Sequence, residues 1–523
     1  ERMIQISGEK DASIFDAHIL LLQDKVILQQ VQTELLKRLQ NVEHIFYVVM
    51  QNYMEVLRRV DDPYLRAKTA DMEDVMQRVI NNLRSTEPPE DEEETEKDQV
   101  LVAYDLTPSD TAAMDASLIH GFATEIGSSV SHTAILARSM GIPAVVGLDQ
   151  ALLRVESHSP AILDGYKGVL ILKPTKETEE YYHRLQVEKE KAYKALEALR
   201  DLPTITRDGR NIRLSVNVEF PHEYSGIKEV GAEGVGLFRT EFFLLSNPSG
   251  MPDEEEQTRY YRKLAEGCSP HGVIFRTLDS GGDKLPCEQL RTPEPNPFLG
   301  WRGIRVSLSR PELFKQQLRA ILRACADTPG CGIMFPMVSG YTEVVTAKHI
   351  LQECREELER KNIPYARDLK VGIMIEVPSA AIMTDVLARE VDFFSIGTND
   401  LTQYTIAVDR VNNRVANMFR PTHPAVIRIM DMTITAGERE NIPTAICGEM
   451  AGDITLLPLL IGLGATSMSV GVHLVPIIRY AIRNLDYGQC RDMAQKALQA
   501  PNSRAIVDLS TALARKSYPA LFE

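Results

Sequence analysis

The sequence predicts a multidomain α/β protein that ends in a (β/α)8 TIM barrel. Three features lead to this fold class: a helical N-terminal region, a short stretch of alternating strands and helices, and eight strand-then-helix units over the rest of the chain. With 523 residues, the chain is long enough for roughly two to four domains.

Residues 1–86 are predicted to form a small helical bundle. Apolar side chains recur at helical spacing over 14–26 and again over 75–83, and few glycines or prolines interrupt them. Residues 87–99 contain the paired prolines Pro88 and Pro89 and are rich in glutamate and aspartate, which predicts a solvated acidic linker. An interaction tail is the alternative for this segment.

Residues 100–175 are predicted to form a compact α/β domain. Its strand candidates are 101–104, 118–122, 143–147, 161–164 and 168–172, and its helix candidates are 108–116 and 132–140. His132 lies at the start of the second helix, where free backbone N–H groups favour an anionic phosphate. The simpler alternative is a capping serine followed by an incidental histidine.

Residues 176–203 are predicted to be a charged linker helix, and residues 204–523 to form the barrel. Most strand candidates of the barrel are apolar throughout, as parallel strands buried on both faces should be. The eight candidates lie at 214–218, 234–238, 273–278, 332–337, 371–376, 393–397, 443–447 and 466–470.

A barrel of this kind carries its active site at the C-terminal ends of its strands. The chemistry-bearing residues at or after those ends are Arg239, Glu241, Arg276, Glu376, Asn399, Asp400, Arg410 and Cys447. Arginine forks match phosphate and carboxylate oxygens, and two carboxylates on neighbouring strands are the usual protein contribution to Mg²⁺. The combination predicts a small phosphorylated carboxylate bound through Mg²⁺.

Each of these residues taken alone has a simpler interpretation. Arg239 and Arg276 suit ion pairs with Glu241 or Asp279. Glu376 and Asp400 suit helix caps, and Cys447 suits a small buried apolar position. Their joint occurrence at strand ends favours a site. The sequence contains no GxxxxGK[ST] motif, which excludes a Walker-type nucleotide site.

Charge and cysteine content narrow the partners and the compartment. The chain has 58 lysines and arginines against 73 aspartates and glutamates, a net charge of −15, which disfavours nucleic acid and anionic membranes as partners. No apolar run is long enough to span a bilayer. The seven cysteines show no CxxC spacing, which predicts a reducing cytoplasm. Because the chain begins at Glu1, we expect further residues to precede it.

The barrel and histidine segments together resemble a known family. SHTAILARSMGIPAVVG, GAEGVGLFRTEF, RTLDSGGDK, NPFLGWRGIR, GTNDLTQYTIAVDR and CGEMAGD occur in the order found in enzyme I of the bacterial phosphoenolpyruvate-dependent sugar phosphotransferase system. The resemblance implies that residues 1–86 bind the carrier protein HPr and that residues 100–175 are a swivelling phosphohistidine domain. It also implies that the barrel binds phosphoenolpyruvate and pairs two copies into a homodimer.

The resemblance further implies a role for each candidate residue. Glu376 and Asp400 would hold Mg²⁺, and His132 would attack the phosphorus of phosphoenolpyruvate. The phosphate and carboxylate of the substrate would be held by Arg239, Arg276, Asn399, Asp400 and Arg410. Cys447 would protonate the enolpyruvate, and the phosphoryl group would pass from His132 to HPr.

One departure from the family pattern leaves alternatives open. Residues 127–130 are Gly-Ser-Ser-Val, where the family has Gly-Gly-Arg-Thr before the serine and phosphohistidine. The arginine that commonly neighbours the histidine is therefore a serine in this chain. This altered run suggests a weakly active regulatory scaffold as one alternative. A nitrogen-regulatory paralogue, with the same chemistry on a different carrier, is a second alternative, because such paralogues usually bear an N-terminal sensory domain and we expect further residues to precede this chain.

Overall fold

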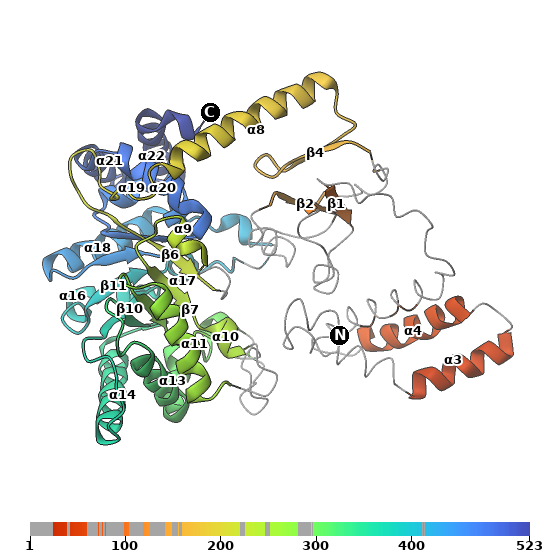
Figure 1. The fold of residues 1–523 in the computed structure, drawn as a ribbon, viewed down its shortest axis with the longest axis horizontal. Coiled ribbons are helices and arrows are strands. Elements are labelled where there is room, and N and C mark those ends of the chain that lie inside the picture. The colour runs from red at the N-terminus through yellow and green to blue at the C-terminus, as the bar shows by residue number, and fades with distance from the viewer. Residues whose placement is uncertain are drawn as a thin grey trace. The chain divides into compact units, whose positions relative to one another are not determined.

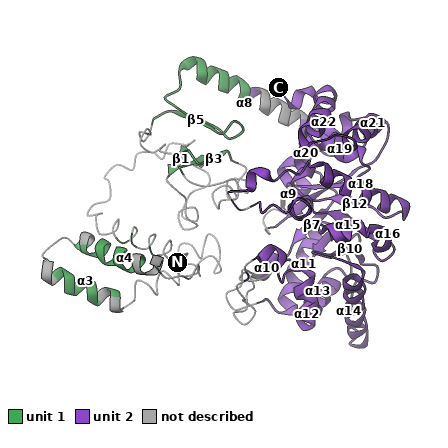
Figure 2. Ribbon diagram, turned by 180° about the vertical axis from the view of Figure 1, so that it is seen from behind, with its two compact units in different colours: residues 1–186 green, residues 187–523 purple. Residues whose placement is uncertain are grey.

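The computed structural model describes two compact units, residues 1–186 and 187–523, which we treat separately (Figures 1 and 2). Within them it describes residues 25–38, 42–59, 72, 76, 79, 99–103, 119–125, 142–148, 155, 159–219, 225–245, 251–280, 294, 296–410, 412 and 414–522. His132, residues 127–130 and the predicted linker over 87–98 lie outside the described residues.

Two helices near the N-terminus pack on each other through one apolar core. They are α3 (Lys25–Arg38) and α4 (Val42–Arg59). The buried side chains are Ile27 and Val31 on the first helix, Ile45, Phe46, Val49, Met50 and Met54 on the second, with Met72 and Met76 beyond. The predicted helical bundle is confirmed over these residues, while most of the predicted stripe at 14–26 lies outside them.

The predicted α/β domain contains a three-stranded parallel sheet and a hairpin. The sheet has the order β1 (Gln99–Ala103), β2 (Ile119–Thr124), β3 (Ala144–Val146), and the antiparallel hairpin joins β4 (Ala161–Asp164) to β5 (Val169–Leu172). All five strands match the sequence prediction. Because β1 begins at Gln99, the last residue assigned to the acidic linker belongs to the sheet. The helix candidates over 108–116 and 132–140 lie outside the described residues.

The long helix α8 (Lys176–Glu197) follows the hairpin and contains the boundary between the two units. The Asp164 carboxylate joins the hairpin to this helix. It accepts from the backbone N–H groups of Tyr166 and Lys167 in the hairpin turn, both at 3.0 Å, and from the hydroxyl of Tyr182 on α8 at 3.2 Å. The predicted linker helix is therefore present and ends six residues before the predicted end at 203.

Eight parallel strands close into a barrel in the second unit. They are β6 (Arg213–Val218), β7 (Val235–Arg239), β8 (Val273–Arg276), β9 (Gly332–Phe335), β10 (Lys370–Ile375), β11 (Phe393–Ile396), β12 (Thr444–Ile446) and β13 (Ser467–Val470). Strand β13 pairs with β6, so the sheet has no free edge. Each strand overlaps one sequence candidate, which confirms the predicted (β/α)8 barrel.

Helices surround the barrel (Figure 2). The α-helices are α9 (Ser225–Glu229), α10 (Glu241–Leu245), α11 (Glu254–Gly267), α12 (Ile304–Ser309), α13 (Pro311–Ala324), α14 (Tyr341–Arg360), α15 (Pro378–Ile382), α16 (Thr384–Leu387), α17 (Thr398–Ile406), α18 (Pro424–Arg439), α19 (Leu457–Gly462), α20 (Val475–Asn484), α21 (Tyr487–Leu498) and α22 (Ser503–Ser517). The 3₁₀ turns are η6 (Pro297–Leu299), η7 (Ala416–Met418), η8 (Glu449–Gly452), η9 (Val472–Leu474) and η10 (Pro519–Leu521).

Alternate strand side chains face opposite sides of the barrel wall. Phe238, Phe275 and Phe394 belong to the large core under the helices, whereas Leu237 and Met374 belong to a small separate cluster. The period of two along a strand explains this division, because one set must face the helices and the other the barrel interior. The interior set forms the floor of the mouth. No described helix is both long and apolar enough to cross a membrane.

Candidate active site at the barrel mouth

A cavity of about 160 Å³ opens at the C-terminal ends of the barrel strands. Its lining consists of Leu237, Arg239, Arg276, Asp279, Arg302, Met374, Glu376, Gly397, Asn399, Asp400, Arg410, Cys447 and Gly448. All seven barrel residues singled out in the sequence for substrate, metal or proton transfer are among them. The described structure thus brings together side chains that lie up to 208 positions apart in the chain, from 239 to 447.

Strand ends account for the positions of most of these residues. Arg239 and Arg276 are the last residues of β7 and β8 and stand opposite each other in the strand register. Glu376 directly follows β10, and Asp400 lies in the first turn of the helix after β11. Cys447 follows β12, and its backbone N–H donates to the carbonyl of Ile396 at 3.1 Å.

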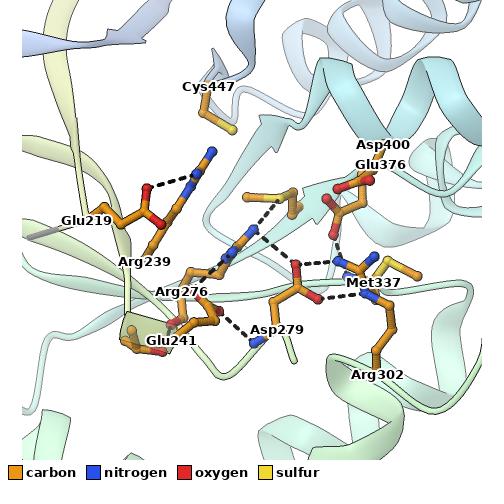
Figure 3. Close-up of polar contacts among 12 residues, drawn as sticks. Glu219, Arg239, Glu241, Arg276, Asp279, Arg302, Met337, Glu376, Asp400 and Cys447 are labelled. Atoms are coloured by element: carbon orange, nitrogen blue, oxygen red, sulfur yellow. Dashed lines mark hydrogen bonds and ion pairs between the residues drawn. The ribbon is translucent and has the colours of Figure 1, made fainter. Parts of the chain in front are cut away.

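One carboxylate, that of Asp279, contacts two arginines of the cavity (Figure 3). Its Oδ2 lies 3.1 Å from Nη1 of Arg276 and 2.9 Å from Nη2 of Arg302. Its Oδ1 accepts from Nε of Arg302 at 3.2 Å, so the pair with Arg302 is bidentate. Burial alone would raise the pKa of Asp279, but the guanidiniums of Arg276 and Arg302 hold it below its ordinary value.

Glu241 completes the support of Arg276 from the other side. Its Oε2 lies 3.1 Å from Nη2 of Arg276, and its Oε1 accepts from the backbone N–H of Asp279 at 2.7 Å. Arg276 is thus held between two carboxylates, and its side chain is 11% exposed. A guanidinium held in this way presents its remaining N–H groups in fixed directions.

Glu376 and Asp400 place two carboxylates in the same cavity (Figure 3). Glu376 is 1% exposed, and its Oε1 accepts from the backbone N–H of Met337 at 2.7 Å. Burial raises the pKa of Glu376 to about 8, with further contributions from the negative charges of Asp279 and Asp400. Oδ1 of Asp400 is buried without a hydrogen-bond donor among the described residues, and its ion pair with Arg410 is 3.4 Å long.

Three arginines of the cavity retain buried donors without an acceptor among the described residues. These donors are Nε of Arg239, Nε of Arg276 and Nη1 of Arg410. A buried donor without a partner costs free energy, so groups of this kind are normally satisfied by a protein atom, water or ligand. The arrangement suits a ligand that carries several anionic oxygens.

Cys447 is 3% exposed and differs from its charged neighbours in character. Burial raises the pKa of its thiol to about 11, so the thiol keeps its proton at neutral pH. Its Sγ donates to the carbonyl of Ile396 at 3.5 Å, and its own carbonyl accepts from Nδ2 of Asn217 at 3.1 Å. A buried protonated thiol in a polar cavity is suited to donating a proton.

Sequence reasoning named Asp279 only as an ion-pair partner for an arginine, a pairing observed with Arg276, and it assigned no role to Arg302. Both lie in the long connection between β8 and β9, in segments recognised only as part of the family pattern. Gly303 turns this connection with φ of 60°, and a Cβ there would lie 2.8 Å from Met337 and 3.2 Å from Oδ1 of Asp279. An arginine followed by a glycine, as at Arg302 and Gly303, is common in loops. That pattern alone therefore does not indicate a contact between Arg302 and Asp279.

Comparison with family models first defines the class of protein. The PEP-binding domain of PEP-utilising enzymes matches residues 193–487, their mobile domain matches 95–168, and their N-terminal domain matches 1–68. The chain therefore contains the three domains of a PEP-utilising enzyme.

Similar curated proteins narrow the assignment. A phosphoenolpyruvate-protein phosphotransferase of Staphylococcus carnosus is 39% identical over 503 residues, which cover 96% of this chain and 87% of that protein. One from Listeria innocua is 38% identical, with 97% and 88% covered. The chain belongs to the phosphoenolpyruvate-protein phosphotransferase family, and it is an enzyme.

Two solved structures each match about a third of the chain. A solution structure of an enzyme I protein is 34% identical, covers 36% of this chain and 76% of its own, and has a TM-score of 0.29. The N-terminal domain of a nitrogen enzyme I is 26% identical, with 34% and 71% covered and a TM-score of 0.24.

We expect Asp279→Asn to lower the free energy of unfolding by about 3 kcal/mol at pH 7, because two buried guanidiniums lose the charge that both contact. Urea unfolding followed by circular dichroism measures this change. Since the pKa of Asp279 is lowered in the folded protein, its contribution is present above the ordinary aspartate range and is lost as pH falls. The difference between wild type and variant should therefore narrow only below about pH 4.

Glu359→Gln is the matched control for this prediction. Its carboxylate lies 3.4 Å from Arg367, but the two side chains are 61% and 76% exposed. An exposed ion pair contributes little, so this variant should unfold like the wild type. Equal destabilisation by both substitutions would contradict the role of Asp279 described here.

Proposed function

We propose that the chain transfers the phosphoryl group of phosphoenolpyruvate to His132 and then to a histidine of an HPr-type carrier, the first step of the sugar phosphotransferase system. The observation that carries this proposal is the composition of the cavity. Arginine donors without acceptors, two adjacent carboxylates and a protonated thiol line a single cavity of about 160 Å³. Each matches a different part of phosphoenolpyruvate or of its reaction.

The arginines and Asn399 bind the substrate in this proposal. Phosphoenolpyruvate carries a phosphate and a carboxylate, and the free donors of Arg239, Arg276 and Arg410 supply N–H groups for both. Asn399 lines the same cavity, and its Oδ1 accepts from the backbone N–H of Glu449 at 3.4 Å. That contact orients the side-chain amide and leaves its NH₂ group as a further donor to the substrate.

Glu376 and Asp400 would hold the divalent metal, which we propose to be Mg²⁺. The donor set fits, because two carboxylates confined in one buried cavity repel each other, and Mg²⁺ prefers a few carboxylate oxygens together with substrate oxygens. When bound, such an ion neutralises negative charge on the substrate oxygens. Asp279 is unsuited to this role, since both its oxygens already contact guanidiniums.

The reaction then needs a nucleophile and a proton donor. We assign the nucleophile to His132: its ring nitrogen forms a bond to phosphorus while the bond from phosphorus to the enol oxygen breaks. The arginines stabilise the charge on the phosphoryl oxygens during the transfer. Cys447 gives its thiol proton to the methylene carbon of the enolpyruvate, which becomes pyruvate. Because His132 belongs to a different domain, transfer requires that domain to move between the barrel and the carrier.

The carrier partner is assigned to the N-terminal helices. Helices α3 and α4 bury one face against each other and leave Gln29, Gln30 and Tyr47 exposed. The match of residues 1–68 to the N-terminal domain of PEP-utilising enzymes supports a shared role for this region. A nitrogen-regulatory paralogue would use a different carrier, so phosphoryl transfer to HPr distinguishes the two functions.

We also propose that the barrel forms a homodimer through helices α14, α15, α16 and α18. These helices contact one another on one side of the barrel (Figure 1). Large apolar side chains remain exposed on them: Tyr341, Val345, Ile382, Met383, Val386 and Met432, at 36% to 61%. Exposed apolar side chains gathered on neighbouring elements are typical of an interface.

We expect His132→Ala to abolish labelling by phosphoenolpyruvate, because no other residue is proposed to carry the phosphoryl group. The measurement is incubation with labelled phosphoenolpyruvate and Mg²⁺ followed by mass spectrometry, and omission of Mg²⁺ should also suppress labelling of the wild type. His120→Ala, on β2 of the same domain, is the control and should be labelled normally. Persistent label in His132→Ala would remove that residue from its role, and an unlabelled wild type would favour the scaffold alternative.

We expect Cys447→Ala to slow turnover of phosphoenolpyruvate by roughly 10²–10⁴-fold, the usual contribution of a positioned acid. Phosphoryl exchange between enzyme and phosphorylated carrier needs no such proton and should continue at the wild-type rate. Cys354→Ala is the control, since Cys354 is also buried but lies in α14 away from the cavity lining. Equal loss of turnover and exchange in Cys447→Ala would argue against proton donation.

We expect Ile382→Glu to weaken self-association at least about tenfold, because it places a charge in the proposed apolar interface. Sedimentation equilibrium measures the dissociation constant. Tyr166→Glu, at an 88% exposed position in the other unit, is the control and should leave association unchanged. A dissociation constant unaffected by Ile382→Glu would place the interface elsewhere.

A further inference from the structure

The cavity has one apolar wall, and it lies on the barrel interior. Leu237, Met374 and Cys447 line the cavity, are 2%, 2% and 3% exposed, and form one apolar cluster together with Met334. Every other lining residue is charged, an asparagine or a glycine. The cavity therefore offers apolar contact in one direction only, the direction of the Cys447 thiol.

Strand geometry places this wall directly below the charged residues. Leu237 precedes Arg239 by two positions on β7, and Met374, on β10, precedes by two positions Glu376, the residue directly after that strand. Residues two apart on a strand face the same side, so each apolar side chain occupies the interior layer beneath a charged one. The cavity therefore has a charged rim, with the apolar wall beneath it.

Met374 is held in place by its neighbours. Its Sδ accepts from Nη1 of Arg276 at 3.9 Å. A Cβ on Gly397 would lie 3.1 Å from that sulfur and 2.9 Å from Oε2 of Glu376, so the absence of a side chain at 397 is what gives both groups room. The contacts with Arg276 and with the backbone at Gly397 thus set the position of the Met374 side chain.

We propose that Leu237 and Met374 bind the methylene end of phosphoenolpyruvate and determine how large a substituent that carbon carries. The inference rests on the proposed function. Phosphate and carboxylate need the cationic rim, and the methylene group is the only apolar part of the substrate. It is also the carbon that Cys447 protonates, so it must face the wall to which Cys447 belongs. Leu237 and Met374 complete that wall and leave room for an unsubstituted methylene.

The test compares phosphoenolpyruvate with its methyl homologue, in which CH₃ replaces one vinyl hydrogen, using both isomers and the full chain. The quantity measured is the ratio of kcat/KM for phosphoenolpyruvate to kcat/KM for the homologue. A contact of one carbon with an apolar wall discriminates by roughly 10–200-fold, so the wild type should prefer phosphoenolpyruvate at least about tenfold. Leu237→Ala and Met374→Ala should each lower this ratio about tenfold or more.

Met334→Ala is the matched control. Met334 is 0% exposed and belongs to the same apolar cluster, but it does not line the cavity. The ratio should therefore stay at the wild-type value in this variant. Because both substrates are measured on the same sample, partial unfolding cancels from the ratio, and a merely structural role would not change it.

Leu237→Val is measured alongside, because Leu237→Ala removes buried methyl groups and lowers stability. It should shift the ratio in the same direction by a smaller factor. An unchanged ratio in the variants of Leu237 and Met374, with phosphoenolpyruvate still turned over, would overturn this inference and leave the proposed function standing. A wild type that does not use phosphoenolpyruvate would overturn both.

Discussion

Closure of the parallel barrel is the constraint on which the site depends. Strand β13 pairs with β6, so all eight C-terminal strand ends meet around one mouth. Because the strands are parallel, their C-terminal ends lie at the same end of the barrel. The side chains at positions 239, 276, 376 and 447 lie at or directly after four of these ends and therefore line one cavity. Without closure, the same residues would lie along the edge of an open sheet.

The pairing of charges in the cavity then determines which of these side chains remain available to bind a ligand. Buried charges are tolerated only when they are paired, and the arginines at the barrel mouth are paired to different extents. Asp279 and Glu241 satisfy most of Arg276, while Nε of Arg239 and Nη1 of Arg410 keep no acceptor among the described residues. The unevenness separates groups that build the site from groups that remain available to a ligand.

The sequence was sufficient for the barrel because its strands are buried on both faces and therefore apolar throughout. The sequence was also sufficient to place Arg239, Arg276, Glu376, Asp400 and Cys447 at the barrel mouth, because each lies at or just after the end of a predicted strand. Asp279 directly follows the strand candidate 273–278 and was named only as an ion-pair partner. Its second partner, Arg302, could not be found in this way, because the position of Arg302 depends on the path of a loop. The contact between Asn217 and the carbonyl of Cys447 joins residues 230 apart, and no local pattern reports it. The role of His132 remains a prediction.

Asp279 pairs with Arg302 in a bidentate manner and also contacts Arg276. These contacts affect the conformational entropy that is lost when a ligand binds. A free arginine side chain carries about 2 kcal/mol of rotamer entropy, which a ligand must remove when it immobilises the guanidinium. In this protein the rotamer entropy of Arg276 and Arg302 is already lost during folding, because Asp279 holds both side chains in the absence of a bound anion. Binding energy that would otherwise order these arginines remains available to hold the substrate in a reactive orientation.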